Sequence, residues 1–278
     1  MEATDALDPP SRPPSRHLPR HRQPRIRPHR HDLRTAASRT DKDRENIRRG
    51  IRKHDWNLEL AKQAQDFGFF YDRMHVPTMA ARHGGWVRSE RRDVAEHALF
   101  RRGMLFFLRR ADERIAGVLC RLEGDVLVIR LAGVLEGDPV HYRDGAQLVL
   151  YHLVMRWAIE EGIAHAELSG SRPFISEGLY AFKRKFRPRI VVPRTHFARK
   201  RLVLIPRRDT PEVRDFLCEH PAITIDPAGK LHVTYLYDRD RPPRVDLPWD
   251  CSGITGAHEL HLDDLLAGLP RPDAHDGR

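Results

Sequence analysis

One stretch of the sequence, residues 104–186, changes its hydrophobic periodicity in an order that few folds accommodate. Three strand-like apolar runs fill 104–134, and the turn Glu123-Gly124-Asp125 joins the last two as a hairpin. A helical repeat follows at 145–161, then a strand at 163–168 and a short helix at 176–186. This order predicts an α+β fold whose mixed, largely antiparallel sheet is flanked by helices, but it does not by itself identify a function.

The helix expected at 145–161 has the clearest pattern in the chain. Its apolar side chains recur at helical spacing, at Ala146, Val149, Leu150, Leu153, Val154, Trp157 and Ala158. Gly145 begins this helix and Gly162 ends it. Upstream, the pattern predicts helices at 41–54 and 90–102, an extended segment at 56–60, and a helix from about residue 67 that Pro77 interrupts or ends.

The short helix at 176–186 and the segments after it are less regular. Helical spacing places Leu179, Phe182 and Phe186 on the core side and leaves Tyr180 and Lys183 elsewhere. Further strands are expected at 190–192, 202–205 and 231–237, with a helix at 211–220 among them. The domain is expected to span 38–239. The Pro-rich extension 240–278 has loose patterning and a possible last helix at 258–266.

Residues 1–37 form a low-complexity arm. Its prolines block regular helix, and before Thr35 it holds eight arginines against four acidic residues, with almost no apolar side chains to bury. The sequence therefore predicts a disordered basic arm that is dispensable for folding. The arm is either a solvated tail or an electrostatic contact for nucleic acid or anionic membrane. No aromatic residues are interleaved to stack on bases.

Composition sets the outer limits on function. The 278 residues carry a formal net charge of +10, part of it in the arm, and the remainder is enough to attract a phosphorylated ligand. The three cysteines are far apart, which indicates reduced thiols in a cytoplasmic protein. No secretory signal and no run of about 18 apolar residues is found, so we expect a soluble protein without a membrane span.

Several catalytic motifs are missing from the sequence. It has no Walker loop, no GxGxxG and no Gly-x-Ser-x-Gly elbow. His258 and His261 do not have the HExxH spacing that places two ligands on one zinc ion, so we expect no metal site.

Two places in the sequence contain candidate binding or catalytic residues, judged from residue type and position alone. Gly145 and Ala146 open a helix, where unpaired N–H groups favour a phosphate; the alternative is a plain helix start. Glu167 lies at a strand end on the face opposite Ala166, where it can act as a base for an attacking amine; the alternative is a carboxylate bonded to loop amides.

Four motifs resemble those of one enzyme family. They are the Phe70-Tyr71 pair with Met74 and Pro77, the Ile115-Ala116-Gly117 strand, the run Glu167-Leu168-Ser169-Gly170-Ser171, and the aromatic and lysine-rich run at 178–186. Together they resemble a GNAT-superfamily N-acyltransferase of the FemAB-like and CelD-like branch, over roughly residues 38–237. The sequence departs from that pattern at Phe186, where Trp is usual, at Arg187, where Gly often follows, and at the phosphate motif, of which only residues 143–146 remain.

The resemblance implies an enzyme that moves an acyl group to an amine of a small molecule, sugar or cell-envelope precursor. The donor would be acetyl-CoA or another acyl-CoA, used as a cosubstrate rather than a permanent cofactor. Some relatives use aminoacyl-tRNA instead, so tRNA is a possible partner. A function of another class also stays open, namely a non-catalytic basic protein that binds nucleic acid.

The resemblance also implies roles for particular residues. Arg143, Gly145 and Ala146 would bind the donor phosphates, and the backbone of Ala132, Gly133 and Val134 would bind the thioester carbonyl. Tyr180 would protonate the leaving group. Lys183 would offset charge on a tetrahedral intermediate or hold a phosphate, unless it belongs with Arg184 and Lys185 to a solvated basic face. These implied site residues are Ala132, Gly133, Val134, Arg143, Gly145, Ala146, Glu167, Tyr180 and Lys183.

Overall fold

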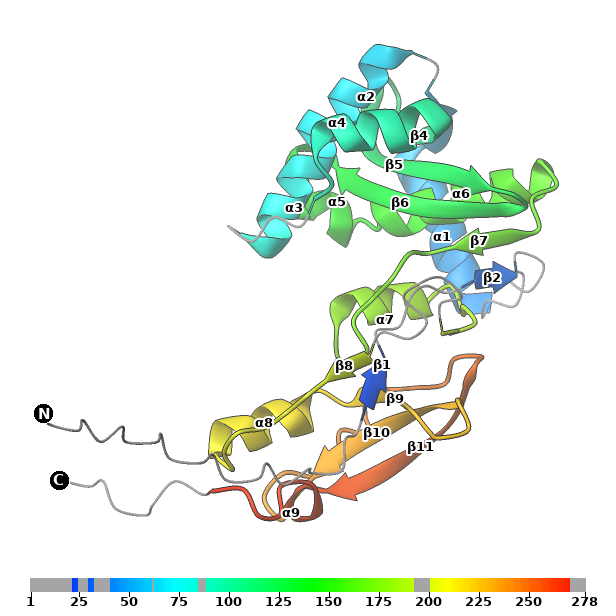
Figure 1. The fold of residues 1–278 in the computed structure, drawn as a ribbon. Coiled ribbons are helices and arrows are strands. Elements are labelled where there is room, and N and C mark those ends of the chain that lie inside the picture. The colour runs from blue at the N-terminus through cyan, green and yellow to red at the C-terminus, as the bar shows by residue number, and fades with distance from the viewer. Residues whose placement is uncertain are drawn as a thin grey trace, which may run out of the picture.

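The structure is a computed structural model, and it describes residues 22–24, 30–32, 41–61, 63–84, 89–192 and 201–270. Figure 1 shows two lobes: one holds a six-stranded sheet and the other a three-stranded sheet, with a short helix between them. Among the described residues, no helix has both the length and the apolar character needed to cross a membrane.

The six-stranded sheet has the order β2-β7-β6-β5-β4-β3. Its strands are β2 (Arg30–Asp32), β3 (Trp56–Leu60), β4 (Gly103–Arg110), β5 (Glu113–Glu123), β6 (Val126–Val134) and β7 (His165–Glu167). Neighbours are antiparallel except β6 and β7, which pair in parallel across the helix that connects them. The predicted antiparallel runs, the hairpin turn and the mixed α+β class are confirmed.

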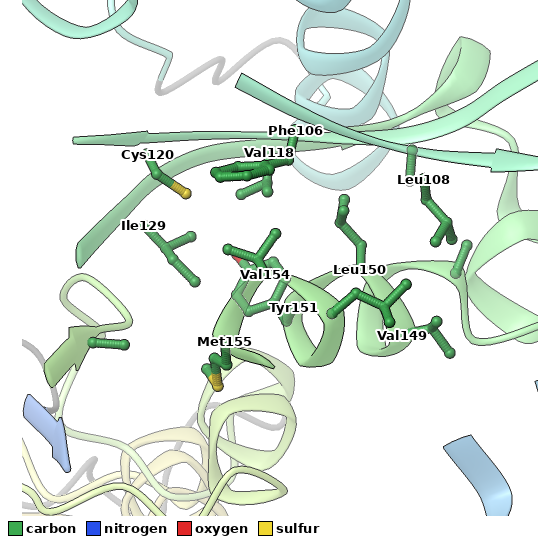
Figure 2. Packing of buried hydrophobic residues seen from close by; sticks show 14 of the residues in the cluster. Phe106, Leu108, Val118, Cys120, Ile129, Val149, Leu150, Tyr151, Val154 and Met155 are labelled. Carbon is green, nitrogen blue, oxygen red and sulfur yellow. The ribbon is translucent and has the colours of Figure 1, made fainter. Parts of the chain in front are cut away.

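Apolar side chains cover both faces of this sheet. On one face lie α6 (Ala146–Glu160) and α1 (Asp41–His54), and Figure 2 shows Leu150 and Val154 of α6 on the side that faces Phe106 and Val118 of the sheet. The other face is covered by α2 (Ala64–Phe70) and by the helical turns α4 (Arg92–Val94), η3 (Ala95–Leu99) and η4 (Phe100–Arg102). Helix α6 also packs its Tyr151 ring 5.2 Å from the Phe182 ring on the side away from the sheet, which explains why it is apolar around most of its circumference.

The helix expected to be interrupted or ended near Pro77 continues past that residue. A π-helical segment, η2 (Tyr71–His75), follows α2, and Pro77 falls in the first turn of α3 (Val76–His83), where a missing N–H is tolerated. The backbone of η2 packs directly on Gly133 of β6, where a Cβ atom would lie 2.5 Å from the Met74 carbonyl carbon. This close approach brings η2 onto the sheet.

The second lobe contains more strand than the sequence indicated. Its elements are α7 (Gly178–Arg184), β8 (Arg201–Val203), α8 (Pro211–Glu219), β9 (Ala222–Ile225), β10 (Leu231–Tyr237), β11 (Ile254–His261) and α9 (Leu262–Leu265). In its three-stranded sheet, β10 pairs antiparallel with β9 and parallel with β11. The helix predicted at 258–266 is wrong up to His261, because this stretch pairs with β10. The strand predicted at 190–192 is also absent, although the Ile190 amide donates to the Ser252 carbonyl.

Two three-residue strands lie within the arm expected at 1–37. β1 (Arg22–Pro24) pairs antiparallel with β8, and β2 pairs antiparallel with β7. The arm was expected to lack regular structure, but these two segments form strands. The rest of the arm lies outside the described residues.

Candidate functional site

Strands β6 and β7 separate after a short pairing. They pair in parallel only from Val126 to Val128 of β6, and the last partner on β7 is Glu167. Ser169 then adopts a left-handed backbone conformation, with φ of 56°, and its hydroxyl donates to the Ile129 carbonyl. The part of β6 beyond Ile129 therefore runs on without β7 beside it.

Lys183 of α7 closes the loop that follows β7. Its ammonium nitrogen lies 2.7 Å from the Ser169 carbonyl oxygen, 2.9 Å from the Gly170 carbonyl oxygen and 3.2 Å from the Ser171 hydroxyl. Three donors thus have three acceptors, and the residue is only 4% exposed. Lys183 is not part of a solvated basic face.

Burial changes the charge state of Lys183. Desolvation lowers its pKa from 10.5 to about 7, although the negative charge of Glu167 acts in the opposite direction. Near neutral pH this lysine therefore exists in both its charged and neutral forms. Glu167 itself is half-buried at the end of β7. The structure thus places these two predicted site residues within electrostatic reach of one another.

The sequence pattern predicted the buried side of α7 only in part. Leu179 is 43% exposed, whereas Tyr180 and Lys183 are buried. The second lobe is the reason, because Tyr180 packs in its apolar core with Ile223. Phe186 is buried against the first lobe, as expected.

Tyr180 is poorly placed as a proton donor to a leaving group. Its hydroxyl donates to the Cys251 sulfur at 3.6 Å, and burial raises the pKa of the phenol. The group is enclosed in the second lobe and already has an acceptor. A packing role accounts for Tyr180 better than the catalytic role that the family resemblance implied.

The backbone expected to bind a thioester carbonyl is already occupied. The Val134 amide donates to the Thr78 hydroxyl at 2.9 Å, and the Ala132 carbonyl lies 3.0 Å from Nδ1 of His75. Gly133 lies against η2. The expectation that the Val134 N–H is a free donor is therefore corrected: α3 supplies its partner.

Sequence reasoning missed both His75 and Thr78. His75 follows Met74, and a regular α-helix would turn it away from the apolar face that includes Phe70. The π-helical turn brings its ring to within 6.0 Å of the Phe70 ring instead. The sequence patterns that predict α-helices contain no signal for such a turn.

The start of α6 is open. Gly145 has φ of 87°, no side chain caps the helix, and a Cβ atom at Gly145 would meet nothing within 4 Å. Arg82 of α3, which sequence reasoning also missed, donates to the Gln147 side chain at 3.0 Å and lies over the Tyr142 ring. Arg143 is exposed just before Gly145. Two arginines beside an uncapped helix N-terminus suit an anionic group.

Within the described ranges, no group of three or more metal-ligating side chains is found. His258 contacts the Thr234 hydroxyl at 2.9 Å, and the His261 ring packs edge-on against Tyr237. These contacts account for the two histidines of β11 as parts of the second sheet.

Residues 37–184 match the family model described as the acetyltransferase (GNAT) domain. The chain belongs to this GNAT family. The six-stranded sheet, α6 and the Lys183 loop therefore form an acyltransferase-type domain, as the resemblance implied. No curated protein matches this chain significantly.

Three solved structures that match part of this chain are a putative lysylphosphatidylglycerol synthetase, L-PGS and FemX. The C-terminal domain of a putative lysylphosphatidylglycerol synthetase from Agrobacterium fabrum is 17% identical, with TM-score 0.44, over 59% of this chain and 57% of that one. L-PGS from Bacillus licheniformis is 14% identical, with TM-score 0.43, over 59% and 57%. FemX is 12% identical, with TM-score 0.48, over 60% of each chain. This chain thus spans less than two thirds of each.

Proposed function

We propose that this GNAT domain transfers an acyl group from an acyl-CoA to a primary amine of a small molecule, sugar or cell-envelope precursor. The observation that carries the proposal is the open N-terminus of α6 with Arg82 and Arg143 beside it. The helix dipole, the unpaired amides and the two guanidinium groups favour the phosphates of such a donor.

The separated part of β6 connects this phosphate site to the Lys183 loop. Thr78 bonds the Val134 amide and also accepts from the Tyr142 hydroxyl at 3.4 Å, so the end of β6 adjoins the start of α6. At the other end, Ile129 accepts from Ser169. Val134 is five residue steps from Ile129 along the strand, which is roughly 16 Å of extended chain. A donor extended from the start of α6 toward Ile129 would place its acyl carbon near the loop.

The chemistry at the acyl carbon requires a neutral amine. We assign its deprotonation to Glu167, the half-buried carboxylate at the end of β7. Lys183 supports the reaction by holding residues 169–171 in place and by opposing negative charge on a tetrahedral intermediate. Lys183→Met should therefore lower turnover about ten- to a thousandfold and change donor binding far less.

An aminoacyl-tRNA donor is the second candidate. The observation that favours it is the basic surface of α1, on which Arg48, Arg49 and Arg52 are exposed. Such a surface attracts a polyanion. A basic protein that binds nucleic acid without catalysis would use the same residues, but would have no need of the Lys183 loop.

A thermal-shift titration with coenzyme A tests the donor. At about 100 times its dissociation constant, a ligand that binds only the folded state stabilises it by about 2.7 kcal/mol. Arg82→Ala and Arg143→Ala should each weaken binding about tenfold, the loss expected for one charge-assisted contact. Arg156→Ala is the matched control, because Arg156 is exposed at the other end of α6 and pairs only with Glu160 among described residues.

Three results are informative. A shift with coenzyme A that depends on Arg82 and Arg143, and not on Arg156, supports the acyl-CoA donor. No shift with coenzyme A, together with retention of aminoacyl-tRNA in a gel assay, would replace it with the tRNA donor. Retention of any RNA or DNA, with no acyl transfer from acyl-CoA or aminoacyl-tRNA, would favour the non-catalytic protein.

A further inference from the structure

A serine and a histidine outside the proposed donor and Lys183 sites form a short contact. The Ser89 hydroxyl oxygen lies 2.6 Å from Nε2 of His75, and Nδ1 of the same ring lies 3.0 Å from the Ala132 carbonyl oxygen. His75 is 2% exposed, whereas Ser89 is only half-buried. A partly exposed hydroxyl therefore contacts a buried imidazole, whose other ring nitrogen is held by a backbone carbonyl.

The carbonyl decides which nitrogen of His75 carries the proton. A carbonyl oxygen only accepts, so Nδ1 must be protonated for its 3.0 Å contact with Ala132 to be a hydrogen bond. In the neutral ring, Nε2 is then the basic nitrogen. Ser89 is the donor that the structure places beside it. The Ser89 proton has a second acceptor in the Glu90 carbonyl at 3.2 Å, but only the His75 contact pairs the buried nitrogen.

The surroundings keep His75 neutral and oriented. Burial lowers its pKa from 6.5, and the hydrogen bond to Ala132 opposes this shift only in part. The π-helical turn sets the ring between Phe70 and Tyr71. Among the described residues, the titratable and charged groups around the pair are those linked to Glu90. The Tyr71 hydroxyl donates to the Glu90 carbonyl at 2.6 Å, and Arg130 pairs with the Glu90 carboxylate at 3.4 Å.

A hydroxyl, a base and a group that orients the base are the three parts of an activated nucleophile. We propose that Ser89 is such a nucleophile, with His75 as its base, and that it accepts an acyl group from an activated carboxylic acid derivative. The pair adjoins the part of β6 that lies between the start of α6 and the Lys183 loop, because His75 contacts the Ala132 carbonyl oxygen.

The step is balanced with the groups present. Ser89 Oγ attacks the acyl carbon and forms the new C–O bond while its proton passes to Nε2 of His75. The C–S bond of a thioester then breaks, and the departing thiolate takes that proton. The use of a thioester rests on the proposed function, whereas the reactivity of Ser89 does not.

A second serine–histidine contact in the molecule serves as an internal control. Ser176 lies 2.8 Å from Nδ1 of His220, which is as short a contact, but His220 packs among the rings of Phe174 and Phe216. Among the described residues, no backbone carbonyl is bonded to the other nitrogen of His220. If a short Ser–His contact alone activates a serine, both serines should react. If the fixed tautomer matters, only Ser89 should react.

A fluorophosphonate probe tests this on the whole chain without any assumption about donor or acceptor. We expect the probe to add to Ser89, identified by peptide mass spectrometry, and not to Ser176. Ser89→Ala should abolish the adduct and Ser176→Ala should leave it unchanged. His75→Gln, whose amide can still donate to Ala132, should slow labelling about a hundredfold, the lower range of what a positioned base contributes.

The pH dependence separates activation from a structural role. The base form of His75 is required, so labelling should be lost as the pH falls through its pKa, with a midpoint below 6.5. Incubation with acetyl-CoA should then give an acetyl ester on Ser89. If the fluorophosphonate labels Ser89 and acetyl-CoA does not, the acyl donor is of another kind and the thioester step is wrong.

Two outcomes overturn the proposal itself. One is a folded wild-type protein in which Ser89 does not react, or reacts no faster than Ser176. The other is labelling of Ser89 that stays the same in a folded His75→Gln variant. If His75→Gln does not fold, the rate at Ser89 relative to Ser176 and its pH midpoint still decide the question. Coenzyme A binding measured in parallel keeps this result separate from the donor assignment.

Discussion

The two lobes bury their interiors in different ways. The first lobe is a sheet between two apolar layers, and Phe106 and Leu119 are fully buried in those layers. The second lobe has smaller apolar clusters and a network of ion pairs. Arg214 of α8 bonds Asp209 through two nitrogens, at 2.6 and 2.8 Å, and also reaches Asp238 and Asp263. Apolar packing in the first lobe does not depend on charges that could lose their partners. In the second lobe, removal of one member of the buried ion-pair network leaves a charge behind and is strongly destabilising.

The largest effect should follow from removing Arg214. Arg214→Leu removes the guanidinium group that pairs with the buried carboxylates of Asp209 and Asp238, and the loss of one member of a buried pair costs about 3–5 kcal/mol. Urea denaturation with hydrogen exchange at β10 would measure it. Arg156→Leu, at an exposed pair, should cost less than about 1 kcal/mol. Equal losses in the two variants would mean that the network does not hold the second lobe.

A smaller effect, at the junction of the lobes, concerns Lys183 and pH. Its pKa of about 7 in the folded protein lies below its ordinary 10.5, so the unfolded chain binds one more proton between these values. Stability should therefore rise with pH in this window. Relative to Lys183→Met, the wild type should gain about 2–3 kcal/mol from pH 7 to pH 9, at about 1.4 kcal/mol per pH unit. The exposed Lys185→Met variant should show no such slope against the wild type; a flat Lys183 comparison would mean that the ammonium is hydrated.

The smallest effect tests the close packing of the first lobe. Gly133→Ala places a Cβ atom 2.5 Å from the Met74 backbone, so η2 must move, at a cost of about 1–3 kcal/mol. The control is Gly178→Ala, where nothing lies within 4 Å. Urea midpoints should fall for the first variant and stay level or rise for the second. An unchanged Gly133→Ala would show that η2 does not rest on β6.

The sequence predicted the first lobe well because its elements are regular. The strands that include Phe106 and Val126, and the helix between Gly145 and Gly162, each bury a face that periodicity reveals. The second lobe was predicted less well. Residues 254–261 alternate weakly and are mostly exposed, so their pairing with β10 left no apolar pattern to detect.

The candidate site was predicted in part. Lys183 and Glu167 come together because both flank one loop, and that proximity follows from local sequence. The burial of Tyr180 does not, since it depends on a lobe whose packing is non-local. Arg82, which is far from Gly145 in the sequence but adjoins the start of the same helix, could not be found from spacing alone.

Helix α7 has a mechanical consequence for the loop it closes. Lys183 holds that loop, while Tyr180, one turn earlier, is embedded in the other lobe. A seven-residue helix is too short to twist between these two points, so any rotation that released the lysine would have to draw the tyrosine ring out of its apolar surroundings. The second lobe thus fixes α7, and with it the position of the loop, through the Tyr180 ring, which takes no part in the proposed reaction.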